Sequence, residues 1–96
     1  MTLDDIRNSR REEILRLAAA HGASNVRVFG SVARGDQTAD SDIDLLVDLA
    51  PNRSLMDLGG LLVDLQGLLG ARVDVATEQM LKPRVRAGAL VDAVLL

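Results

Sequence analysis

The 96-residue sequence has no cysteine, tryptophan or tyrosine, and it contains one histidine and one phenylalanine. The absence of cysteine excludes disulfide bonds, zinc sites built on thiolates and a thiol nucleophile. The single histidine, His21, excludes metal sites made of several histidines. Only Phe29 is aromatic and the net charge is −3, so the chain lacks both the stacking platforms and the positive surface typical of nucleic-acid binders. We therefore do not expect nucleic acid to be the main partner.

Long hydrophobic runs are also missing. No apolar run reaches the ~20 residues that a membrane-spanning helix needs, and the N-terminal segment is polar, unlike a signal peptide. We therefore expect a cytoplasmic protein. Hydrophobic residues, nearly all of them aliphatic, make up 48% of the chain, which is enough for the core of a single domain over residues 1–96.

The hydrophobic pattern predicts helices and strands in alternation. Apolar residues at three- and four-residue steps indicate helices, and short β-branched runs indicate strands. In chain order, the expected elements are a helix over 4–20, a strand over 26–30, a turn-rich connection over 31–41 with room for one helical turn, a strand over 42–49, a helix over 55–69 between Ser54 and Gly70, a strand over 71–77 and a helix after Pro83. The expected fold class is α/β, a small mixed β-sheet with helices packed on it. The sheet should be mixed because the link between the first two strands is too short for a crossover helix.

Two features of the helices need a reason. Gly59, Gly60 and Gly67 each weaken the helix predicted over 55–69, and close packing against the sheet would account for them. The C-terminal tail is unusually apolar, and it is expected to end as a helix or as an edge strand. Its apolar residues exceed what one short terminal helix needs, so we expect part of it to join an interface with a second copy or a partner protein. These residues are Leu90, Val91, Val94, Leu95 and Leu96.

Clustered carboxylates point to a metal site. Asp42 and Asp44 are two residues apart at the start of a predicted strand, so both side chains should project from the same face. Like charges held so close repel, and a cation between them would turn that repulsion into attraction. Oxygen ligands of this kind suit magnesium, which usually takes one or two carboxylates and completes its shell with water and substrate phosphate. Asp74, between Val73 and Val75 in another predicted strand, is a third candidate for the same centre.

Gly30-Ser31 supplies a second half of this candidate site. A glycine at a strand end lets a ligand approach the backbone closely. If Ser31 begins a helical turn, its free N–H and its hydroxyl favour an anion. A Gly-Ser pair alone also occurs in ordinary turns, but here the Asp-X-Asp strand begins twelve residues after Gly30.

The whole stretch "GSVARGDQTADSDIDLLV" resembles the signature of the polymerase-beta-like nucleotidyltransferase superfamily, and the short chain is similar to its minimal (MNT) branch. The resemblance implies that Gly30 and Ser31 bind the nucleoside triphosphate and that Asp42 and Asp44 hold two magnesium ions. It also implies that Asp74 completes the metal-binding, catalytic set. It covers about residues 26–75, and Val32 departs from the polar residue that members often carry after Gly-Ser.

Two of the site assignments have a structural alternative. Arg34 could contact the phosphates of a bound nucleotide or be an ordinary surface arginine. Asp74 could be a metal ligand or the ion-pair partner of Arg72 or another arginine. Asp42 and Asp44 could also be a solvated strand start, but the Gly30-Ser31 turn upstream favours a functional site. The intact set of three aspartates favours an enzyme over a protein that only binds.

The resemblance implies an enzyme that moves a nucleoside monophosphate, expected to be AMP from ATP, to an acceptor hydroxyl with release of pyrophosphate. Small members of this kind are often antitoxins that adenylylate a HEPN-type toxin, so a co-encoded toxin is one expected partner. Two alternatives stay open from the sequence. The chain could neutralise a partner by contact alone, or it could modify a small molecule, although it has no room for the helical substrate domain of larger transferases.

Overall fold

The computed structural model describes residues 1–96, and its centre is a four-stranded sheet. The strands are β1 (Ala23–Phe29), β2 (Ile43–Leu49), β3 (Val73–Ala76) and β4 (Val94–Leu95), and their order in the sheet is β3-β2-β1-β4. β1 is antiparallel to β2 and to β4, whereas β2 and β3 are parallel. The expected mixed sheet is therefore confirmed. The short helix α3 (Gly30–Arg34) returns the chain antiparallel, while the longer helix α4 (Leu55–Leu69) carries it across to a parallel strand.

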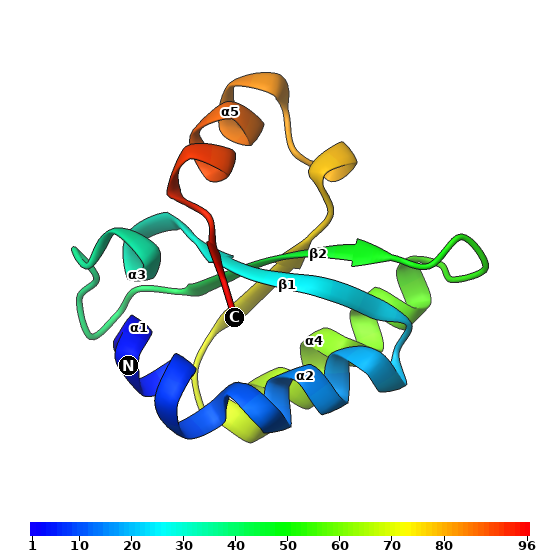
Figure 1. Ribbon diagram of the computed structural model, residues 1–96, viewed down its shortest axis with the longest axis horizontal. Coiled ribbons are helices and arrows are strands. Elements are labelled where there is room, and N and C mark those ends of the chain that lie inside the picture. Colours follow the sequence, from blue (N-terminus) through cyan, green and yellow to red (C-terminus); the bar gives the residue numbers. More distant parts are fainter.

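Helices cover the two faces of the sheet unequally (Figure 1). α2 (Arg11–Ala20) and α4 lie along one face, which we call the helix-covered face. On the other side stand only α5 (Pro83–Asp92) and the short 3-10 helix η2 (Glu78–Met80). We call that side the open face.

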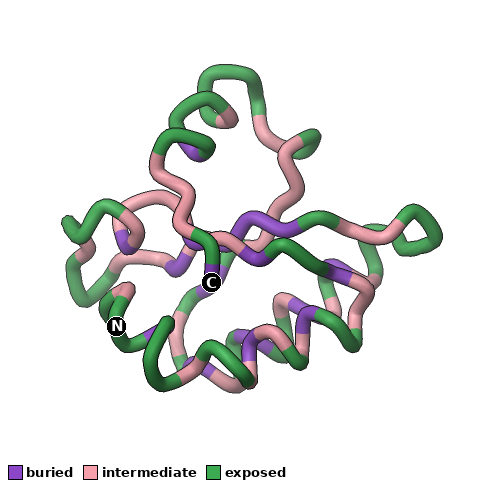
Figure 2. The backbone as a smooth tube through the Cα atoms, viewed as in Figure 1, coloured by how far each residue is buried: buried purple, intermediate pink, exposed green.

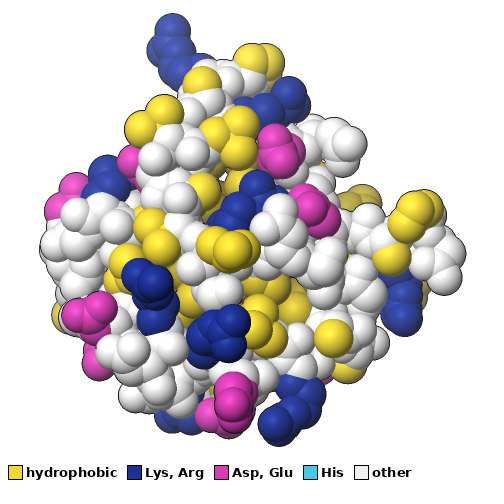
Figure 3. Space-filling view, viewed as in Figure 1, with side chains coloured by type: hydrophobic (Ala, Val, Ile, Leu, Met, Phe, Trp, Pro, Cys, Tyr) yellow, Lys and Arg dark blue, Asp and Glu magenta, His cyan; other side chains and the backbone are white.

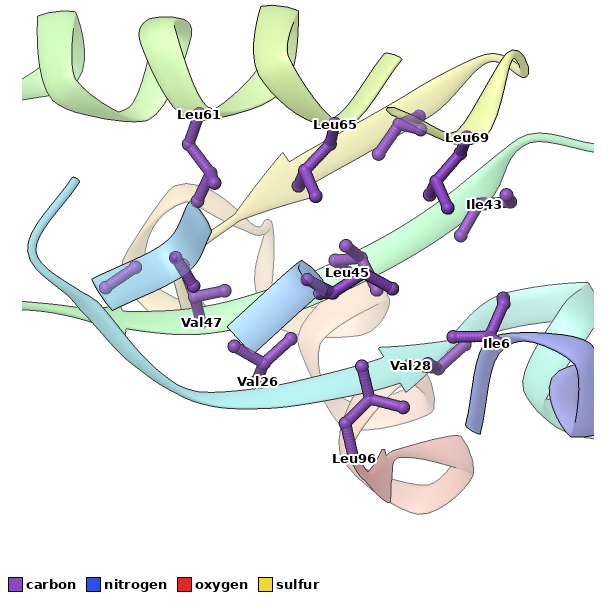
Figure 4. Packing of buried hydrophobic residues seen from close by; sticks show 14 of the residues in the cluster. Ile6, Val26, Val28, Ile43, Leu45, Val47, Leu61, Leu65, Leu69 and Leu96 are labelled. Carbon is purple, nitrogen blue, oxygen red and sulfur yellow. The ribbon is translucent and has the colours of Figure 1, made fainter. Parts of the chain in front are cut away.

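Alternation along β2 separates the core from the open face. Ile43, Leu45 and Val47 are buried in the main hydrophobic cluster, and they meet the leucines of α4 from below (Figure 4). Asp44, Leu46 and Asp48 occupy the intervening positions and are not in that cluster, as the two-residue period of a strand requires, although Leu46 is itself fully buried. Figure 2 shows the same division, with buried positions on the inward sides of α2 and α4.

The N-terminal helix is interrupted, which the sequence did not predict. α1 (Leu3–Asp5) is capped by Thr2, a five-residue π-helix (Ile6–Arg10) follows, and α2 then begins. Ile6 and Ile14 are both fully buried, although eight steps of an ideal α-helix leave a residue about 80° away from its starting direction. A π turn accommodates one additional residue, so the two isoleucines return to nearly the same side.

The glycines of α4 also differ from expectation. A Cβ at Gly60 would lie 2.9 Å from Cε1 of His21, so this glycine packs on α2 and not on the sheet. Gly59 and Gly67 have no atom within 4 Å of an added Cβ, so no close packing explains them. The His21 ring is held there by Asp64, whose Oδ2 lies 2.7 Å from Nε2. The predicted ends of the helix are confirmed, because Ser54 caps α4 and Gly70 follows it with a φ of +61°.

The chain end forms both of the alternatives expected for it. Pro83 begins α5, and the tail then becomes the edge strand β4. The N–H of Leu96 donates to the carbonyl of Val26, and the Leu96 side chain is buried in the core. The strands predicted over 26–30 and 71–77 are observed at Ala23–Phe29 and Val73–Ala76. None of the helices combines the length and the apolar character that crossing a membrane requires.

The difference between the α4 glycines predicts opposite responses to alanine. Gly67→Ala should stabilise the fold by about 0.5–1 kcal/mol, because it removes backbone entropy from the unfolded chain without a clash. Gly60→Ala should lower the melting temperature, because the new methyl group displaces His21 from Asp64. Thermal unfolding of both variants measures this. Equal gains at the two positions would show that the contact with His21 does not matter.

Candidate active site

Asp44 and Asp74 are direct neighbours on the open face. β2 and β3 run parallel with Asp44 opposite Asp74 and with Ile43 opposite Val73. Val73 is buried, so it points to the helix-covered face, and Asp74 is exposed on the other side. The predicted meeting of these two carboxylates is therefore confirmed as geometry.

Gly30 closes the other side of Asp44. This glycine has a φ of +73° and begins α3 directly after β1. A Cβ at Gly30 would collide with Oδ2 of Asp44, so only glycine leaves room for this carboxylate against the turn. Ser31 follows in the same turn and is half-buried. The structure thus joins the Gly-Ser turn and the Asp-X-Asp segment in one place, as the sequence predicted.

The arrangement is electrostatically costly for Asp44. Burial, followed by the charges of Asp74 and Asp42, raises the pKa of the Asp44 carboxyl from 3.8 to about 6, and Arg34 opposes this in part. The ionised form of Asp44 is therefore poorly stabilised by the protein alone. A cation bound beside it would relieve both the desolvation and the repulsion.

Asp42 is oriented differently from the expectation. It lies one residue before β2, which begins at Ile43 and not at Asp42. Its Oδ1 lies 3.1 Å from Nε of Arg72, and the two side chains form an ion pair. Arg72 also donates a hydrogen bond from Nη2 to the carbonyl oxygen of Asp40. The structural alternative for Asp74, an ion pair with Arg72, is therefore wrong in this structure. Asp74 takes part in no ion pair.

Arg34 is held by two carboxylates. Its Nη1 donates to Oδ2 of Asp92 at 2.7 Å, and its Nε donates to Oδ2 of Asp36 at 3.2 Å. These two partners raise the pKa of the Arg34 guanidinium above its ordinary value. Asp92 lies 58 residues away along the chain, and no sequence signal pointed to it. The role of Arg34 in nucleotide binding stays a prediction.

The donor chemistry of the site fits magnesium in part. No three acidic side chains converge closely enough to hold a metal ion by themselves. Two carboxylates, Asp44 and Asp74, nevertheless face one another, and magnesium typically takes one or two carboxylates together with water and substrate phosphate. Asp42 could join them if it left Arg72, an exposed partner whose ion pair costs little to break. The residues therefore fit a magnesium site that a nucleotide completes.

Comparison with known proteins agrees with this geometry. The Nucleotidyltransferase domain family matches residues 10–96. The protein adenylyltransferase MntA of Thermococcus cleftensis is 34% identical over 94 residues, which cover 98% of this chain and 95% of the relative. A Methanocaldococcus jannaschii protein, named as a candidate protein adenylyltransferase, is 37% identical over 91% of this chain and 94% of its own length.

Solved structures give the same result for the fold. A structure described as a candidate minimal nucleotidyltransferase is 51% identical, with a TM-score of 0.86 over 100% of this chain and 97% of that chain. A toxin–antitoxin crystal structure with AMP-PNP has a TM-score of 0.76 at 20% identity, covering 90% of this chain and 71% of that chain. The second likeness supports the fold only.

The raised pKa of Asp44 predicts a pH-dependent stability difference between the wild type and Asp44→Asn. Below pH 3.8 the carboxyl is protonated in both states; between pH 3.8 and about 6 it ionises in the unfolded chain but stays largely protonated in the fold, so the metal-free fold loses stability over this range and no further above it. The upper limit is about 3 kcal/mol, and solvent screening at this half-exposed site reduces it to about 1 kcal/mol. The melting temperature of Asp44→Asn should therefore equal that of the wild type near pH 4 and exceed it at pH 7.

The matched control for this series is Asp42→Asn. Its ion pair with Arg72 offsets the repulsion, so the substitution should shift the melting temperature less than Asp44→Asn does. A stability difference for Asp44→Asn that is constant from pH 4 to pH 7 would contradict the electrostatic explanation.

Proposed function

This chain belongs to the nucleotidyltransferase domain family and is a nucleotidyltransferase enzyme, and we propose that it transfers AMP from ATP to a hydroxyl group of a partner protein. The observation that carries this proposal is the pairing of Asp44 with Asp74 against the Gly30 turn. The relatives named protein adenylyltransferases support the transfer of an adenylyl group. The AMP-PNP in the toxin–antitoxin neighbour supports a nucleoside triphosphate as substrate.

The proposed reaction needs little covalent chemistry from the protein. The oxygen of the acceptor hydroxyl bonds to the α-phosphorus, the bond from that phosphorus to the bridging oxygen breaks, and pyrophosphate leaves. Gly30 and Ser31 position the triphosphate through backbone N–H groups and the serine hydroxyl. Asp74, exposed on β3, accepts the proton of the hydroxyl. Asp42, Asp44 and Asp74 would hold magnesium, which supplies charge neutralisation and polarises the α-phosphate when bound.

If the hydroxyl group that accepts AMP belongs to a tyrosine, that tyrosine must come from another molecule. The chain contains no tyrosine, so it cannot adenylylate its own phenol group. A toxin protein is the proposed acceptor, and a HEPN-type ribonuclease is the specific form that this proposal takes. Two other functions remain candidates: neutralisation of a partner by contact alone, and modification of a small molecule.

One variant separates catalysis from contact. Asp74→Asn should reduce transfer of α-³²P-labelled AMP in magnesium by about 10²–10⁴-fold, because the proton acceptor is lost. Binding of MgATP, measured by calorimetry, should change little because Asp44 remains, and EDTA should abolish both transfer and tight binding. Asp48→Asn is the matched control, since Asp48 lies on β2 but pairs with Arg27 outside the site.

Three results would contradict the catalytic proposal. Asp74→Asn could retain wild-type transfer, transfer could continue in EDTA, or the variant could neutralise its partner as well as the wild type without any transfer. The last result would favour the contact-only function.

We propose the exposed side of α5 as the surface that meets the partner protein. Only Ala89 of this helix is buried, while Leu90 and Val91 are exposed. Leu95 of the neighbouring strand β4 is exposed too, and Figure 3 shows hydrophobic side chains over α5 at the top of the view. Large apolar side chains left exposed near one another are typical of an interaction site. The exposure of Leu90, Val91 and Leu95 supports the expected interface of the apolar tail, and both the interface and its occupant stay proposals.

A charge on this surface should weaken the complex without disturbing the fold. Val91 is 85% exposed, so Val91→Asp should leave the melting temperature unchanged and reduce affinity for the co-encoded toxin at least tenfold. Val63→Asp on α4, at a position 65% exposed, is the matched control and should bind normally. Light scattering of the isolated chain tests self-association in the same samples. Normal toxin binding by Val91→Asp would assign the partner to another surface.

A further inference from the structure

Two cavities adjoin one another where β2 and β3 end, away from the Gly30 turn. The first, of about 450 Å³, lies between the end of β2, η2 and α5. The second, of about 420 Å³, lies between the loop after β2, η2 and the start of α4. Leu49, Thr77 and Gln79 line both of them, and we call the two cavities together the trough. Figure 1 shows η2 above β2, beside α5.

The trough lies on the two strands that carry the paired carboxylates. β2 and β3 are parallel, so both run from the candidate active site toward the trough. Thr77 follows Asp74 by three residues, which is about 10 Å along an extended strand. Asp48 lines the trough and lies on the same face as Asp44, about 13 Å further along β2. Gly30 is at the other end of β2, because the antiparallel β1 ends beside Asp44. The trough is therefore a separate place on the open face.

η2 forms a wall of both cavities and is held in place although none of its residues is buried. From β1, Nη1 of Arg27 lies 3.5 Å from Oε2 of Glu78. From α5, Nε of Arg86 donates to the carbonyl of Glu78 at 2.8 Å, and its Nη2 donates to the carbonyl of the residue after η2 at 3.1 Å. Thr77 and Gln79 take part in none of these contacts, so their hydroxyl and amide groups are available to a ligand. A wall fixed in this way is preorganised for binding.

The trough is polar at one end and apolar at the other. The first cavity is lined mainly by polar side chains: Asp48, Thr77, Glu78, Gln79 and Arg86. Such donors and acceptors suit the peptide groups of a polypeptide backbone. The second cavity has apolar walls at Leu55, Leu58 and Met80, and Leu55 and Met80 are 70% and 50% exposed. Large apolar side chains left exposed beside a groove indicate an interaction site, and methionine adapts to the shape of an apolar partner.

We propose that the trough receives an extended segment of the acceptor protein, with one apolar side chain of that segment in the second cavity. The inference rests on the proposed transfer of AMP to a protein hydroxyl and names the surface that places this hydroxyl at Asp74. The segment covers the distance of about 10 Å from Asp74 to the trough with about three extended residues. A small acceptor bound at Asp74 leaves the second cavity empty, whereas a polypeptide fills both cavities. The exposed side of α5 holds the partner as a whole, and the trough orients the segment that is modified.

The first test uses the first two residues of α4, Leu55 and Met56. Leu55 lines the second cavity, whereas Met56 is 87% exposed and lines neither. An acidic residue in the first turn of a helix is favourable, so neither Leu55→Asp nor Met56→Asp should lower the melting temperature. In transfer of α-³²P-labelled AMP, Leu55→Asp should raise the KM for the co-encoded toxin about tenfold or more, because a charge replaces an apolar wall. Met56→Asp should keep the wild-type KM, and both variants should bind MgATP as the wild type does.

The second test locates the partner segment directly. The chain has no cysteine, so Gln79→Cys gives a single attachment site for a photoreactive benzophenone at an exposed position that lines both cavities. Irradiation with the co-encoded toxin should cross-link a toxin peptide that also contains the residue carrying AMP, because the two lie close along one extended segment. Mass spectrometry identifies both. Val63→Cys, at a 65% exposed position outside the trough, is the matched control and should give no such cross-link.

Each other outcome overturns the inference in a recognisable way. Equal KM values for Leu55→Asp and Met56→Asp show that the trough does not hold the acceptor, and weaker MgATP binding by Leu55→Asp assigns it to the nucleotide. A cross-link between two copies of this chain assigns it to self-association. A cross-link to a part of the toxin remote from the residue carrying AMP shows that the trough does not place the hydroxyl. If Leu55→Asp lowers the melting temperature, the cross-link decides alone. If the wild type transfers no AMP to the toxin, the proposed function fails at its acceptor, and this inference fails with it.

Discussion

The Asp44 carboxylate lies half-buried between Asp74 on the next strand and the backbone of Gly30. The candidate active site on the open face depends on the fold holding this carboxylate in that position. Its ionised form costs at most about 3 kcal/mol. On the opposite side of the same strand, Ile43 and Leu45 are buried in the core, and each contributes about 1.5–3 kcal/mol. The hydrophobic contacts of β2 therefore exceed the electrostatic cost, and the strand holds a repulsive carboxylate pair in place.

This balance explains why the two faces of the sheet differ so much. The helix-covered face contains nearly all of the buried side chains and carries the stability of the fold. The open face has only α5 and η2 above it, and α5 buries a single residue, Ala89. A catalytic surface has to admit a nucleotide and an acceptor, and a face that contributes little to stability can remain uncovered at small cost.

The guanidinium groups around the site form contacts that a substrate can replace. Arg72 binds Asp42 through an exposed ion pair, and Asp36, one partner of Arg34, is 62% exposed. Such pairs contribute about 0–1 kcal/mol, so a metal ion or a phosphate group competes with them easily. Asp92, the other partner of Arg34, is only 19% exposed and connects α3 to α5. Arg34 therefore has one exchangeable partner and one firmer one.

The local features of the chain were determined by the sequence alone. The alternation around Asp44 and around Asp74 placed each carboxylate on the face opposite buried valine, isoleucine or leucine, because a strand has a period of two. Ser54 and Gly70 marked the ends of α4, because capping depends on residues next to the helix. The Gly-Ser turn and the mixed sheet followed from spacing in the same way.

Only the tertiary structure decided which distant residues meet. Three contacts join segments that no local period relates. Asp44 lies opposite Asp74 in the strand register, Arg72 forms an ion pair with Asp42, and Arg34 forms one with Asp92. The π-helix at Ile6–Arg10 and the packing of Gly60 on His21 likewise come from fitting helices to a shared core. Periodicity fixes the face on which a side chain lies, but its partner across the fold depends on how the packed elements are aligned, and that is a property of the whole chain.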